Sequence, residues 1–588
     1  MQRYSPPLKE MRFLLEAFGF EEKLGDIEAF EMYDLATTMA VLETVGNISV
    51  DKLLPINRKG DEEGLKFDPD EATVTLPEGF RDAYQTLVEN GLVGLAGDPE
   101  YGGGGAPEAM GILASEIISA CNKSFSMAPG LTNGLISALQ AHGSDEQKEK
   151  YLSKLIPGEW SGTMCLTEPQ CGTDLGLITT KADPQDDGTY KLTGTKIWIT
   201  FGEHNLTDNI IHFVLARLPD APEGIRGISA FIVPKILDDG TRNPVYCTGL
   251  EEKMGIHASP TCVMALEEAE GYLVGEPHKG MRSMFTMMNM ARLHVGMEGY
   301  ALGEIAYQTA LAFAKERRQG RSLDESKRET DEPADTIMVH PDVRRMLLNI
   351  KSTNEALRAL GVWVGLHHDL AHNHTDETVR QQSSDLVALM TPIMKSYGSE
   401  RGFENISEAM QVCGGSGYTA DWDIEQYMRD ERIAMIYEGT NHIQALDLVG
   451  RKLAKGKGRL LMTFQQRVQQ AMEEAGEYEE VAALLPPFQK AVGRVMEATQ
   501  KLASEGAKDQ EMAAAVASNY LNLFALTALG FMWLKMTTYA VANDHPNAET
   551  KLKTARYFME MVLPETGLYA KLIKAGKDPM MAFSEDEF

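Results

Sequence analysis

The sequence predicts a mainly α-helical protein that carries an inserted β-domain. Apolar residues recur three and four apart from residue 8 to about 160, the spacing alternates from 161 to about 275, and helical spacing returns after Gly280. A chain of 588 residues is also too long for one hydrophobic core. We therefore predict four domains: an N-terminal helical domain (1–160), a middle β-domain (161–278), a helical bundle (279–450) and an extra C-terminal helical domain (451–588).

Helical periodicity marks four segments of the N-terminal region. They cover residues 8–18, 27–54, 80–92 and 106–124, and Pro and Gly residues separate them. Four consecutive glycines follow Tyr101. No strand leads into these glycines and no Lys-Ser or Lys-Thr pair follows them, so they do not indicate a phosphate-binding loop. We interpret them as a flexible loop between helices.

The β-domain is predicted from four alternating segments. Residues 190–200, 209–218, 227–235 and 261–275 are rich in β-branched and aromatic residues and are bounded by Gly, Pro and Asp. We expect each of them to form a strand.

Long apolar stripes predict helices over residues 281–318, 343–373 and 383–415, which most simply pack as a bundle. The charged, proline-containing segment 320–338 predicts a surface loop. Methionine-rich stripes at 281–297 and 531–536 are interpreted as core filler rather than as the lining of a cofactor pocket.

A basic linker at residues 451–459 precedes three or four further predicted helices, of which 511–542 is the most apolar. This C-terminal region either associates with a membrane or covers the rest of the protein. The second role is favoured, because apolar helices of this kind are mostly buried core.

The net charge of -30 and a pI near 4.9 argue against nucleic acid and anionic membranes as partners. Residues 451–588 carry 17 basic and 17 acidic residues, so the acidic excess lies in residues 1–450. Six cysteines without a CxxC pair predict free thiols in a reducing compartment, and no metal site is indicated. The first residues resemble no targeting segment, and we expect a cytoplasmic protein.

Glu438 is the first candidate for catalysis. It lies between the apolar residues 433–437 and Gly439-Thr440. A carboxylate carried on a turn into an apolar cavity is desolvated, which raises its pKa and suits it to remove a weakly acidic C–H proton. The alternative is that Glu438 caps or precedes a helix beginning near Thr440, and this stretch by itself favours that alternative.

Three further motifs offer contacts to a flat or phosphorylated ligand. Residues 164–174 combine hydroxyl-bearing and small residues around a Pro/Gly turn. Trp198 and Thr200 stand two apart on a predicted strand, so we expect them on one face, where an indole and a hydroxyl suit a heteroaromatic ring. A buried Trp in a β-core is the commoner occurrence. Residues 411–418 hold three glycines in four positions, which either admit a ligand close to the backbone or end a helix.

The order of these motifs resembles the acyl-CoA dehydrogenase family. The motifs are CLTEPQCGTD, TGTKIWIT, KERRQGR, QVCGGSGYT and MRDERIAMIYEGTNHIQ, and the similarity covers about residues 80–450. The N-terminal start, the long polar loop before residue 340 and the extra C-terminal domain are most similar to the subgroup of 3-methylmercaptopropionyl-CoA dehydrogenases and related proteobacterial long forms. The resemblance implies an N-terminal helical domain, a middle β-barrel-like domain and a C-terminal four-helix bundle.

The resemblance also implies FAD-dependent oxidation of an acyl-CoA thioester to its trans-2-enoyl form. Glu438 aligns with the base that removes the α-proton while the β-hydrogen leaves as hydride to the flavin. A backbone N–H beside Glu438, assigned to Gly439, would help to hold the thioester carbonyl. Electrons would pass to an electron-transfer flavoprotein.

Cofactor and substrate residues follow from the same resemblance. Flavin contacts are expected from Leu166, Thr167, Trp198 and Thr200. Other cofactor contacts are expected from Thr173, Arg317, Gln411, Gly415, Thr440 and His442, and CoA contacts from Thr173 and Arg292. Because the family's arginine, glutamine and glycine reach the FAD of a neighbouring subunit, a homodimer or dimer of dimers is implied.

Three positions depart from the family pattern. Gly320 stands where an aromatic residue is usual, and His340 and His442 each stand where a glutamine is usual. FAD is still the cofactor implied, but the contacts to the adenine half of FAD are not predicted in detail. Two other functions stay open: an acyl-CoA oxidase that uses oxygen, and a non-enzymatic member of the fold that binds nucleic acid. The second would be expected to have a basic C-terminal region, whereas the net charge of this region is zero. The length of the acyl chain is also open.

Overall fold

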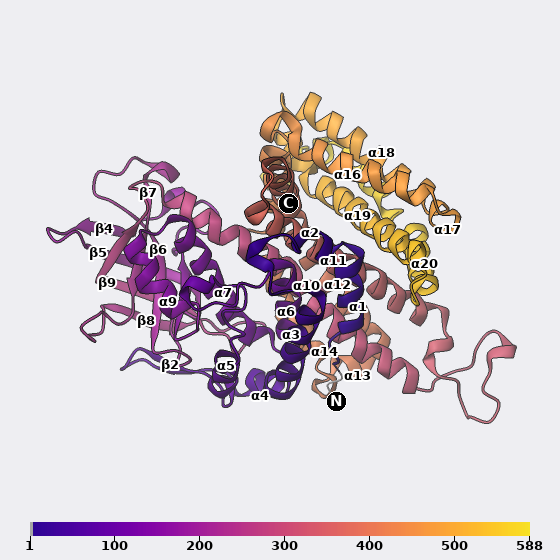
Figure 1. Cartoon of the computed structure of the whole chain (residues 1–588), viewed down its shortest axis with the longest axis horizontal. Helices are drawn as coiled ribbons and strands as arrows, with labels where there is room; N and C mark the ends of the chain where they lie inside the picture. Colours follow the sequence, from indigo (N-terminus) through magenta and orange to yellow (C-terminus); the bar gives the residue numbers. More distant parts are fainter. Residues whose placement is uncertain (1–3) are drawn as a thin grey trace. The chain divides into compact units, whose positions relative to one another are not determined.

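The computed structural model describes residues 4–588, which form two compact units. We call them the helical unit and the β-unit. The helical unit comprises the chain up to Glu43, Pro107–Glu116 and Val295–Phe588. The β-unit comprises Thr44–Ala106 and Ile117–His294. Figure 1 labels the elements of both units.

The β-unit is built on one seven-stranded sheet. Strands β6, β4, β5, β9 and β7 follow one another, and β7 pairs again with β6, so the sheet closes on itself as a barrel. Strand β3 extends the sheet beside β6, and β8 pairs with β9. The strands are β3 (Trp160–Cys165), β4 (Lys181–Pro184), β5 (Tyr190–Thr200), β6 (Asn209–Arg217), β7 (Ile228–Pro234), β8 (Val245–Leu250) and β9 (Thr261–Val274).

The four predicted strands are confirmed as β5, β6, β7 and β9. Strands β3, β4 and β8 were not predicted. Strand β4 has only four residues, and β3 reads as Trp-Ser-Gly-Thr-Met-Cys, which lacks the alternation of a half-buried strand. These short strands belong to the sheet because they pair with neighbouring strands, although their own sequences do not predict a strand.

Helix α7 (Lys123–His142) packs on strand β3. Gly162 of β3 makes this close approach possible, because a Cβ atom at that position would lie 2.7 Å from Leu135 Cδ2 of α7. The contact joins the helix to an apolar core formed by residues such as Ile211, Phe213 and Met287. Met287 comes from the first methionine-rich stripe and serves here as core filler.

The glycine-rich segment after Tyr101 is a hydrogen-bonded loop. The N–H groups of Gly103, Gly104 and Gly105 donate to the carbonyls of Asp98, Gly94 and Gly97. A Cβ atom at Gly103 would lie 2.1 Å from the carbonyl oxygen of Gly97. The glycines therefore allow two backbone segments to pack closely, which differs from the flexible loop that we expected.

The helical unit is organised around three long helices: α10 (Gly280–Glu316), whose first turns belong to the β-unit, α11 (Pro341–Asn373) and α12 (Glu377–Cys413). Arg358 of α11 is buried, and its guanidinium donates to Glu116 Oε1 at 2.8 Å and to Glu304 Oε2 at 2.8 Å. This ion cluster joins α6 (Glu108–Cys121), α10 and α11 in the core of the bundle.

One predicted helix is shorter than expected. The segment 27–54 forms a short 3-10 turn (Glu28–Phe30), and the α-helix begins only at α3 (Leu35–Ile48). Asp34 accounts for the break, because its Oδ1 accepts a hydrogen bond of 2.6 Å from Thr37 N at the start of α3. A side chain that caps a helix fixes its first residue more strongly than apolar spacing does.

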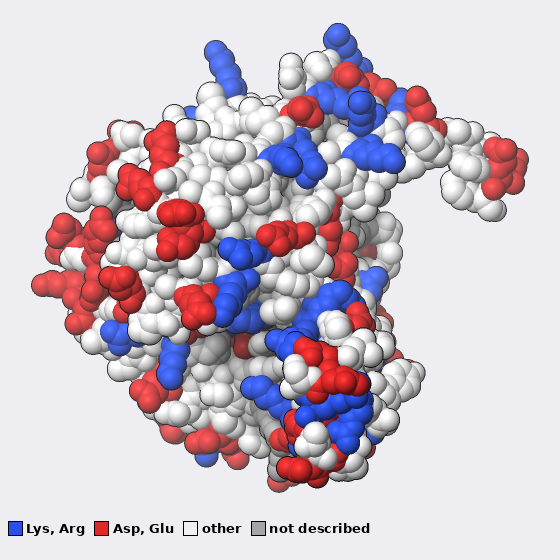
Figure 2. Space-filling view, turned by 90° about the vertical axis from the view of Figure 1, so that its right-hand side faces the viewer, with Lys and Arg blue, Asp and Glu red and all other residues white. Residues whose placement is uncertain are grey.

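The C-terminal region forms five helices of ten or more residues, one or two more than predicted: α16 (Arg459–Gly476), α18 (Leu485–Lys501), α19 (Gln510–Ala542), α20 (Ala548–Tyr557) and α21 (Glu565–Ala575). Figure 1 shows α16, α18 and α19 side by side. Helix α19 is long and apolar enough to cross a membrane, but 67% of its most apolar stretch is buried in the structure. On the face of the molecule drawn in Figure 2, acidic side chains predominate along the left-hand edge, and acidic and basic side chains are mixed toward the right-hand side.

Candidate active site

Glu438 lies on a turn between a 3-10 helix (Arg432–Met435) and helix α15 (Asn441–Asp447). Its φ is +56° and that of Gly439 is +82°. A non-glycine residue in the left-handed region costs roughly 1–2 kcal/mol, so the surrounding structure must hold this turn. Thr440 is the N-cap of α15 and accepts from Ile443 N at 3.4 Å. The helix therefore begins where we expected, and Thr440 rather than Glu438 caps it.

Gln444 supports the Glu438 turn. Its side chain is fully buried, and its Nε2 donates to the carbonyl oxygens of Glu438 at 3.2 Å and Gly439 at 2.9 Å. Gln444 was not among the residues predicted from the sequence. Gln444 follows Glu438 by six residues and lies one helical turn after the N-cap threonine. This spacing is the signal in the sequence that could have identified it.

The surroundings of Glu438 are partly apolar. Ala434 is fully buried, whereas Ile436 is 49% exposed. Tyr437 is half-buried, its hydroxyl donates to Glu298 Oε2 at 2.5 Å, and burial, followed by the Glu298 charge, raises its pKa. Glu438 itself is half-buried. The raised pKa expected for Glu438 stays a prediction.

Asn441 and His442, which follow the turn, attach α15 to two other helices. Asn441 Oδ1 accepts from Lys395 Nζ at 3.1 Å, and its Nδ2 donates to Ser396 O at 3.1 Å, both on α12. His442 Nδ1 lies 3.0 Å from Ser518 Oγ of α19. Asn441 is therefore an anchor of the turn, and His442 links the turn to the C-terminal region. A flavin contact of His442 stays a prediction.

In the β-unit the segment after β3 is held against β5. Lys196 Nζ donates to Leu166 O at 3.1 Å, and Ile197 N donates to Thr167 O at 2.9 Å. These bonds place Leu166 and Thr167 beside the strand that carries Trp198. The structure therefore brings together the residues from two of the sequence motifs.

Trp198 is 60% exposed and has a φ of +59°. The pairing of β5 with β9 shifts between Lys196 and Ile199, so Ile197 and Trp198 form a bulge. Simple alternation along the strand was the reason for placing Trp198 and Thr200 on one face, and the bulge makes that reasoning wrong. It also explains why the largest aromatic side chain of this strand stands in solvent instead of the barrel core.

Glu168 and Lys196 form a buried ion pair behind this segment. Glu168 Oε1 accepts from Lys196 Nζ at 2.8 Å and from Thr180 Oγ1 at 2.6 Å, and Oε2 accepts from Thr179 N at 2.7 Å and Gln170 Nε2 at 2.6 Å. Burial opposes ionisation of Glu168, but the Lys196 charge and these hydrogen bonds lower its pKa to about 2.

The remaining candidates are distributed over both units. Thr173 is exposed on the loop that follows Glu168, and Arg292 is buried in α10, both in the β-unit. Arg317, Gln411 and Gly415 are exposed in the helical unit, at or just beyond the ends of α10 and α12. A 3-10 turn follows Gly415 and Tyr418 and packs on α10. Trp422 of the turn contacts Phe313 of α10, with ring centroids 5.0 Å apart.

The family models that match the chain are those of the acyl-CoA dehydrogenase N-terminal domain (37–159), middle domain (163–269) and C-terminal domain (278–453), and one described as acetyl-CoA dehydrogenase C-terminal like (464–584). The chain belongs to the acyl-CoA dehydrogenase family. This membership confirms the predicted fold class, including the extra C-terminal domain.

Individual relatives give the same result. The chain is 43% identical over 470 residues to the 3-methylmercaptopropionyl-CoA dehydrogenase of Ruegeria pomeroyi, covering 79% of each chain. It is 31% identical over 618 residues to a butyryl-CoA dehydrogenase of Syntrophomonas wolfei, covering 100% of this chain and 99% of the relative. The crystal structure of Caenorhabditis elegans ACDH-11 in complex with C11-CoA shares its fold, with a TM-score of 0.81, 18% identity and 99% and 96% coverage.

An acyl-CoA dehydrogenase is an FAD-dependent oxidoreductase, and the residues present fit the cofactor. The exposed indole of Trp198 on its bulge offers a flat surface to a planar ring. Arg317 is an exposed guanidinium for which the described residues show no side-chain partner, as a phosphate contact requires. Among residues 4–588 there is no group of three or more His, Cys, Asp or Glu side chains that would hold a metal ion.

Two of the departures from the acyl-CoA dehydrogenase pattern contact each other. Gly320 has a φ of +73°, and a Cβ atom there would lie 3.3 Å from His340 Cε1. His340 Nε2 lies 2.7 Å from the carbonyl oxygen of Gln319. The imidazole of His340 therefore lies beside the backbone at the position where other members of the family carry an aromatic side chain.

Proposed function

We propose that this acyl-CoA dehydrogenase converts an acyl-CoA thioester to the trans-2-enoyl-CoA, with Glu438 as the base. The supporting observation is the Glu438 turn, which holds a carboxylate in a strained backbone conformation through a buried amide of Gln444. Strain of this kind is retained where the surrounding structure fixes it, commonly at functional sites.

The proposed step is removal of the α-proton of the thioester by the Glu438 carboxylate. The negative charge that develops on the thioester oxygen is stabilised by the N–H group assigned to Gly439. FAD supplies the oxidising power when bound, because it accepts the β-hydrogen with its electron pair. Leu166, Thr167, Trp198 and Thr200 would hold its ring, while Arg317 and Gln411 would contact its phosphate and adenine parts.

The substrate proposed is 3-methylmercaptopropionyl-CoA, which would give methylthioacryloyl-CoA. The support is the 43% identity to the Ruegeria pomeroyi enzyme of that name. The relative from Syntrophomonas wolfei is named a butyryl-CoA dehydrogenase. Short unsubstituted acyl-CoA esters are therefore the substrates to compare with 3-methylmercaptopropionyl-CoA. A screen of the purified enzyme with 3-methylmercaptopropionyl-CoA and with straight C4 to C16 acyl-CoA esters, using a dye as electron acceptor, tests the assignment.

The Glu438→Gln variant tests the base. Loss of a positioned base typically lowers the rate by about 10²–10⁴-fold, and we expect at least this loss with FAD still bound. Glu404→Gln is the control, because Glu404 is an exposed carboxylate of the same unit and pairs with Arg401. Full turnover by Glu438→Gln would show that another group removes the proton.

The proposed acceptor is an electron-transfer flavoprotein, and the proposed assembly is a homodimer or dimer of dimers. Exposure of Arg317, Gln411 and Gly415 supports the assembly, because residues that reach a neighbouring subunit's FAD must be accessible on their own chain. Arg317→Ala should then weaken FAD retention without changing the fold. Peroxide formed under air in equal amount to product, without any added acceptor, would instead identify an oxidase.

A further inference from the structure

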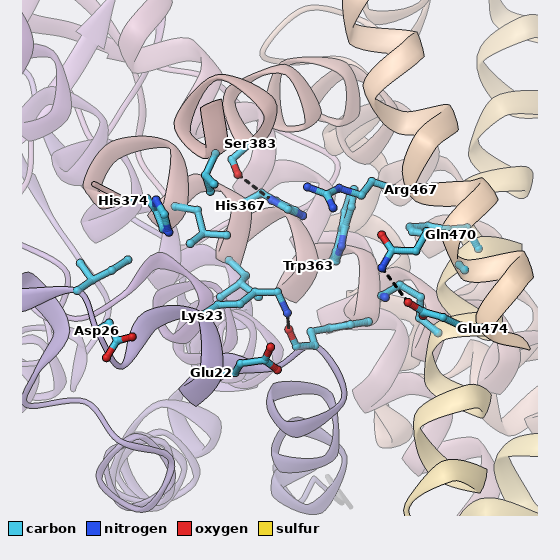
Figure 3. A pocket seen from close by; sticks show the side chains of 18 of the residues that line it. Glu22, Lys23, Asp26, Trp363, His367, His374, Ser383, Arg467, Gln470 and Glu474 are labelled. Carbon is cyan, nitrogen blue, oxygen red and sulfur yellow. Dashed lines mark hydrogen bonds between the residues drawn. The ribbon is translucent and has the colours of Figure 1, made fainter. Parts of the chain in front are cut away.

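The helical unit contains a cavity of about 540 Å³. It lies where the segment from Phe18 to Ile27, the helices α11 and α12, and the C-terminal helices α16 and α19 come together (Figure 3). None of its lining residues is a candidate for base, flavin or substrate contact. Sites for small molecules typically measure about 300–1,000 Å³, so this cavity is large enough to be one.

Three cations line the cavity. Arg467 donates to Gln382 Oε1 at 3.1 Å, and Lys23 Nζ donates to the Phe18 carbonyl at 2.5 Å. Lys535 lies with its Nζ 6.0 Å from the ring centroid of Phe531. Within the described chain, no ion pair joins Lys23, Arg467 or Lys535 to a carboxylate. Figure 3 shows the guanidinium of Arg467 beside His367, and Lys23 lower in the view with its hydrogen bond to the Phe18 carbonyl.

Carboxylates of the lining do not neutralise these cations at close range. Glu22 and Asp26 are exposed residues on the N-terminal side of the cavity. Glu474 accepts a hydrogen bond of 2.8 Å from the exposed Gln470, four residues earlier on α16. Burial lowers the pKa of Lys535, Glu474 opposes this shift, and the Arg467 charge adds to it.

These charges also act on the neighbouring groups. Burial and then the charge of Lys535 lower the pKa of Lys23, whereas Glu22 raises it. His367 is buried, its Nδ1 lies 3.1 Å from Ser383 Oγ, and burial together with Arg467, Lys23 and Lys535 lowers its pKa to about 3. Since these cations destabilise one another, an anion inside the cavity would relieve their repulsion.

Part of the lining is aromatic and aliphatic. Trp363 and Phe531 meet edge to face with ring centroids 5.6 Å apart, and Leu366 and Leu370 lie on the same helix as Trp363. Phe531 and Lys535 occupy one face of α19, four residues apart, so the Lys535 cation has an apolar neighbour. This part of the lining suits a flat ring or a short alkyl chain.

We propose that this cavity binds a small organic anion. Its oxyanion head, a carboxylate or a phosphate, contacts Arg467 and Lys535, and its short apolar body lies against Trp363 and Phe531. Arg467 supplies a planar guanidinium fork, and Lys535 supplies a compact ammonium charge, which together suit either head group.

The test is calorimetric titration of the FAD-loaded enzyme, with its active site saturated by a non-reactive acyl-CoA thioether. Hexanoate and phenylacetate represent carboxylates, and phenyl phosphate represents phosphates. At least one of them should bind once per chain, and the stronger class identifies the source of the head group. Lys535→Met should weaken that binding at least about tenfold, as expected for a charge-assisted hydrogen bond, while Lys535→Arg should retain it.

Lys571→Met is the matched control, because Lys571 is exposed on α21 and lies outside the cavity; it should bind the anion like the unmodified enzyme. If Lys535→Met fails to retain FAD or to fold, Arg467→Gln serves as the deciding variant. Absence of binding by all three anions at about 10 mM, far above the affinities of ordinary ligand sites, overturns the proposal. Binding that is unchanged in a folded Lys535→Met or Arg467→Gln variant also overturns it.

Discussion

Lys196 Nζ lies 2.8 Å from Glu168 Oε1, and both side chains are buried at 0% and 2% exposure. Each comes from a different sequence motif, and the pair ties the Leu166–Thr167 segment to the strand that carries Trp198. Burial lowers the pKa of Lys196, with Glu168 opposing this, whereas the pKa of Glu168 falls to about 2. The carboxylate accepts several hydrogen bonds besides that from Lys196, and these stabilise its ionised form.

Lys196→Met should destabilise the β-unit by about 3–5 kcal/mol, because it leaves a buried carboxylate without its cation. FAD retention should fall with it, since the segment beside Trp198 loses its anchor. Thermal unfolding and the ratio of flavin to protein absorbance measure both effects. Lys191→Met is the control on the same strand, where the ion pair with Glu270 is partly exposed, and it should change stability by at most about 1 kcal/mol.

Gln444→Leu should lower kcat by about 10-fold or more while FAD stays bound. The variant removes the two hydrogen bonds to the carbonyls of Glu438 and Gly439, so the carboxylate is no longer held in its productive position. Steady-state kinetics with a dye acceptor measure the change. Gln469→Leu, on the exposed face of α16, is the control. An unchanged kcat for Gln444→Leu would mean that the turn is held by its backbone alone.

Lys551→Met should detach the N-terminal helix α1 (Leu8–Ala17) from the C-terminal region. Lys551 is buried, pairs with Glu10 at 2.5 Å and Glu355 at 2.8 Å, and lies 4.8 Å from the centroid of Phe13. Glu10, which is half-buried, would lose its cation, whereas Glu355 would keep its ion pair with Lys351, so we expect a cost of about 1–3 kcal/mol. Limited proteolysis should then cut near α1.

Lys553→Met is the control for that experiment. Lys553 lies on the same helix, but both it and its partner Glu549 are exposed, so its loss should leave the proteolysis pattern unchanged. Equal protection of α1 in both variants would show that apolar contacts suffice to hold it.

Stability should decrease as the pH falls below about 6.5. Burial, followed by the Lys235 charge, lowers the pKa of both His204 and His212 to about 3. Because the unfolded chain protonates these residues near 6.5 and the folded chain does not, the unfolded state binds more protons between pH 6.5 and 3. The two residues together contribute a loss of about 3 kcal/mol per pH unit within that window.

Chemical unfolding at pH 7 and at pH 5 measures this dependence. In His212→Gln the loss per pH unit should be smaller by about 1.4 kcal/mol, since one titrating group is removed. A pH dependence equal to that of the unmodified protein would show that His212 is not kept neutral by burial.

Gly320→Phe should destabilise the loop after α10, although it restores the aromatic residue usual in the family. The backbone at Gly320 has a φ of +73°, and the new Cβ would meet His340. A left-handed residue costs roughly 1–2 kcal/mol, which thermal unfolding detects. Adding His340→Gln should not restore stability, because it removes the contact but leaves the backbone conformation. Full recovery in the double variant would identify the contact as the sole cause.

The sequence predicted the long elements well because their patterns are strong. Strand β5 has the bounds expected for it, and α10 and α11 begin and end within two residues of the predicted positions. Short strands such as β3 and β4 were missed, since they are strands only through their neighbours in the sheet. The start of α3 was misplaced because the cap by Asp34 outweighs apolar spacing.

By itself the sequence determined the fold class, the family and the identity of the candidate residues, because motif order and apolar spacing are properties of the chain alone. Only the tertiary structure decided how those residues are held. The bulge that exposes Trp198, the buried amide of Gln444 behind Glu438 and the ion pair of Lys196 with Glu168 each depend on contacts between distant segments. Hydrogen bonds and burial of this kind arise when distant segments pack together, and no local pattern in the sequence encodes them.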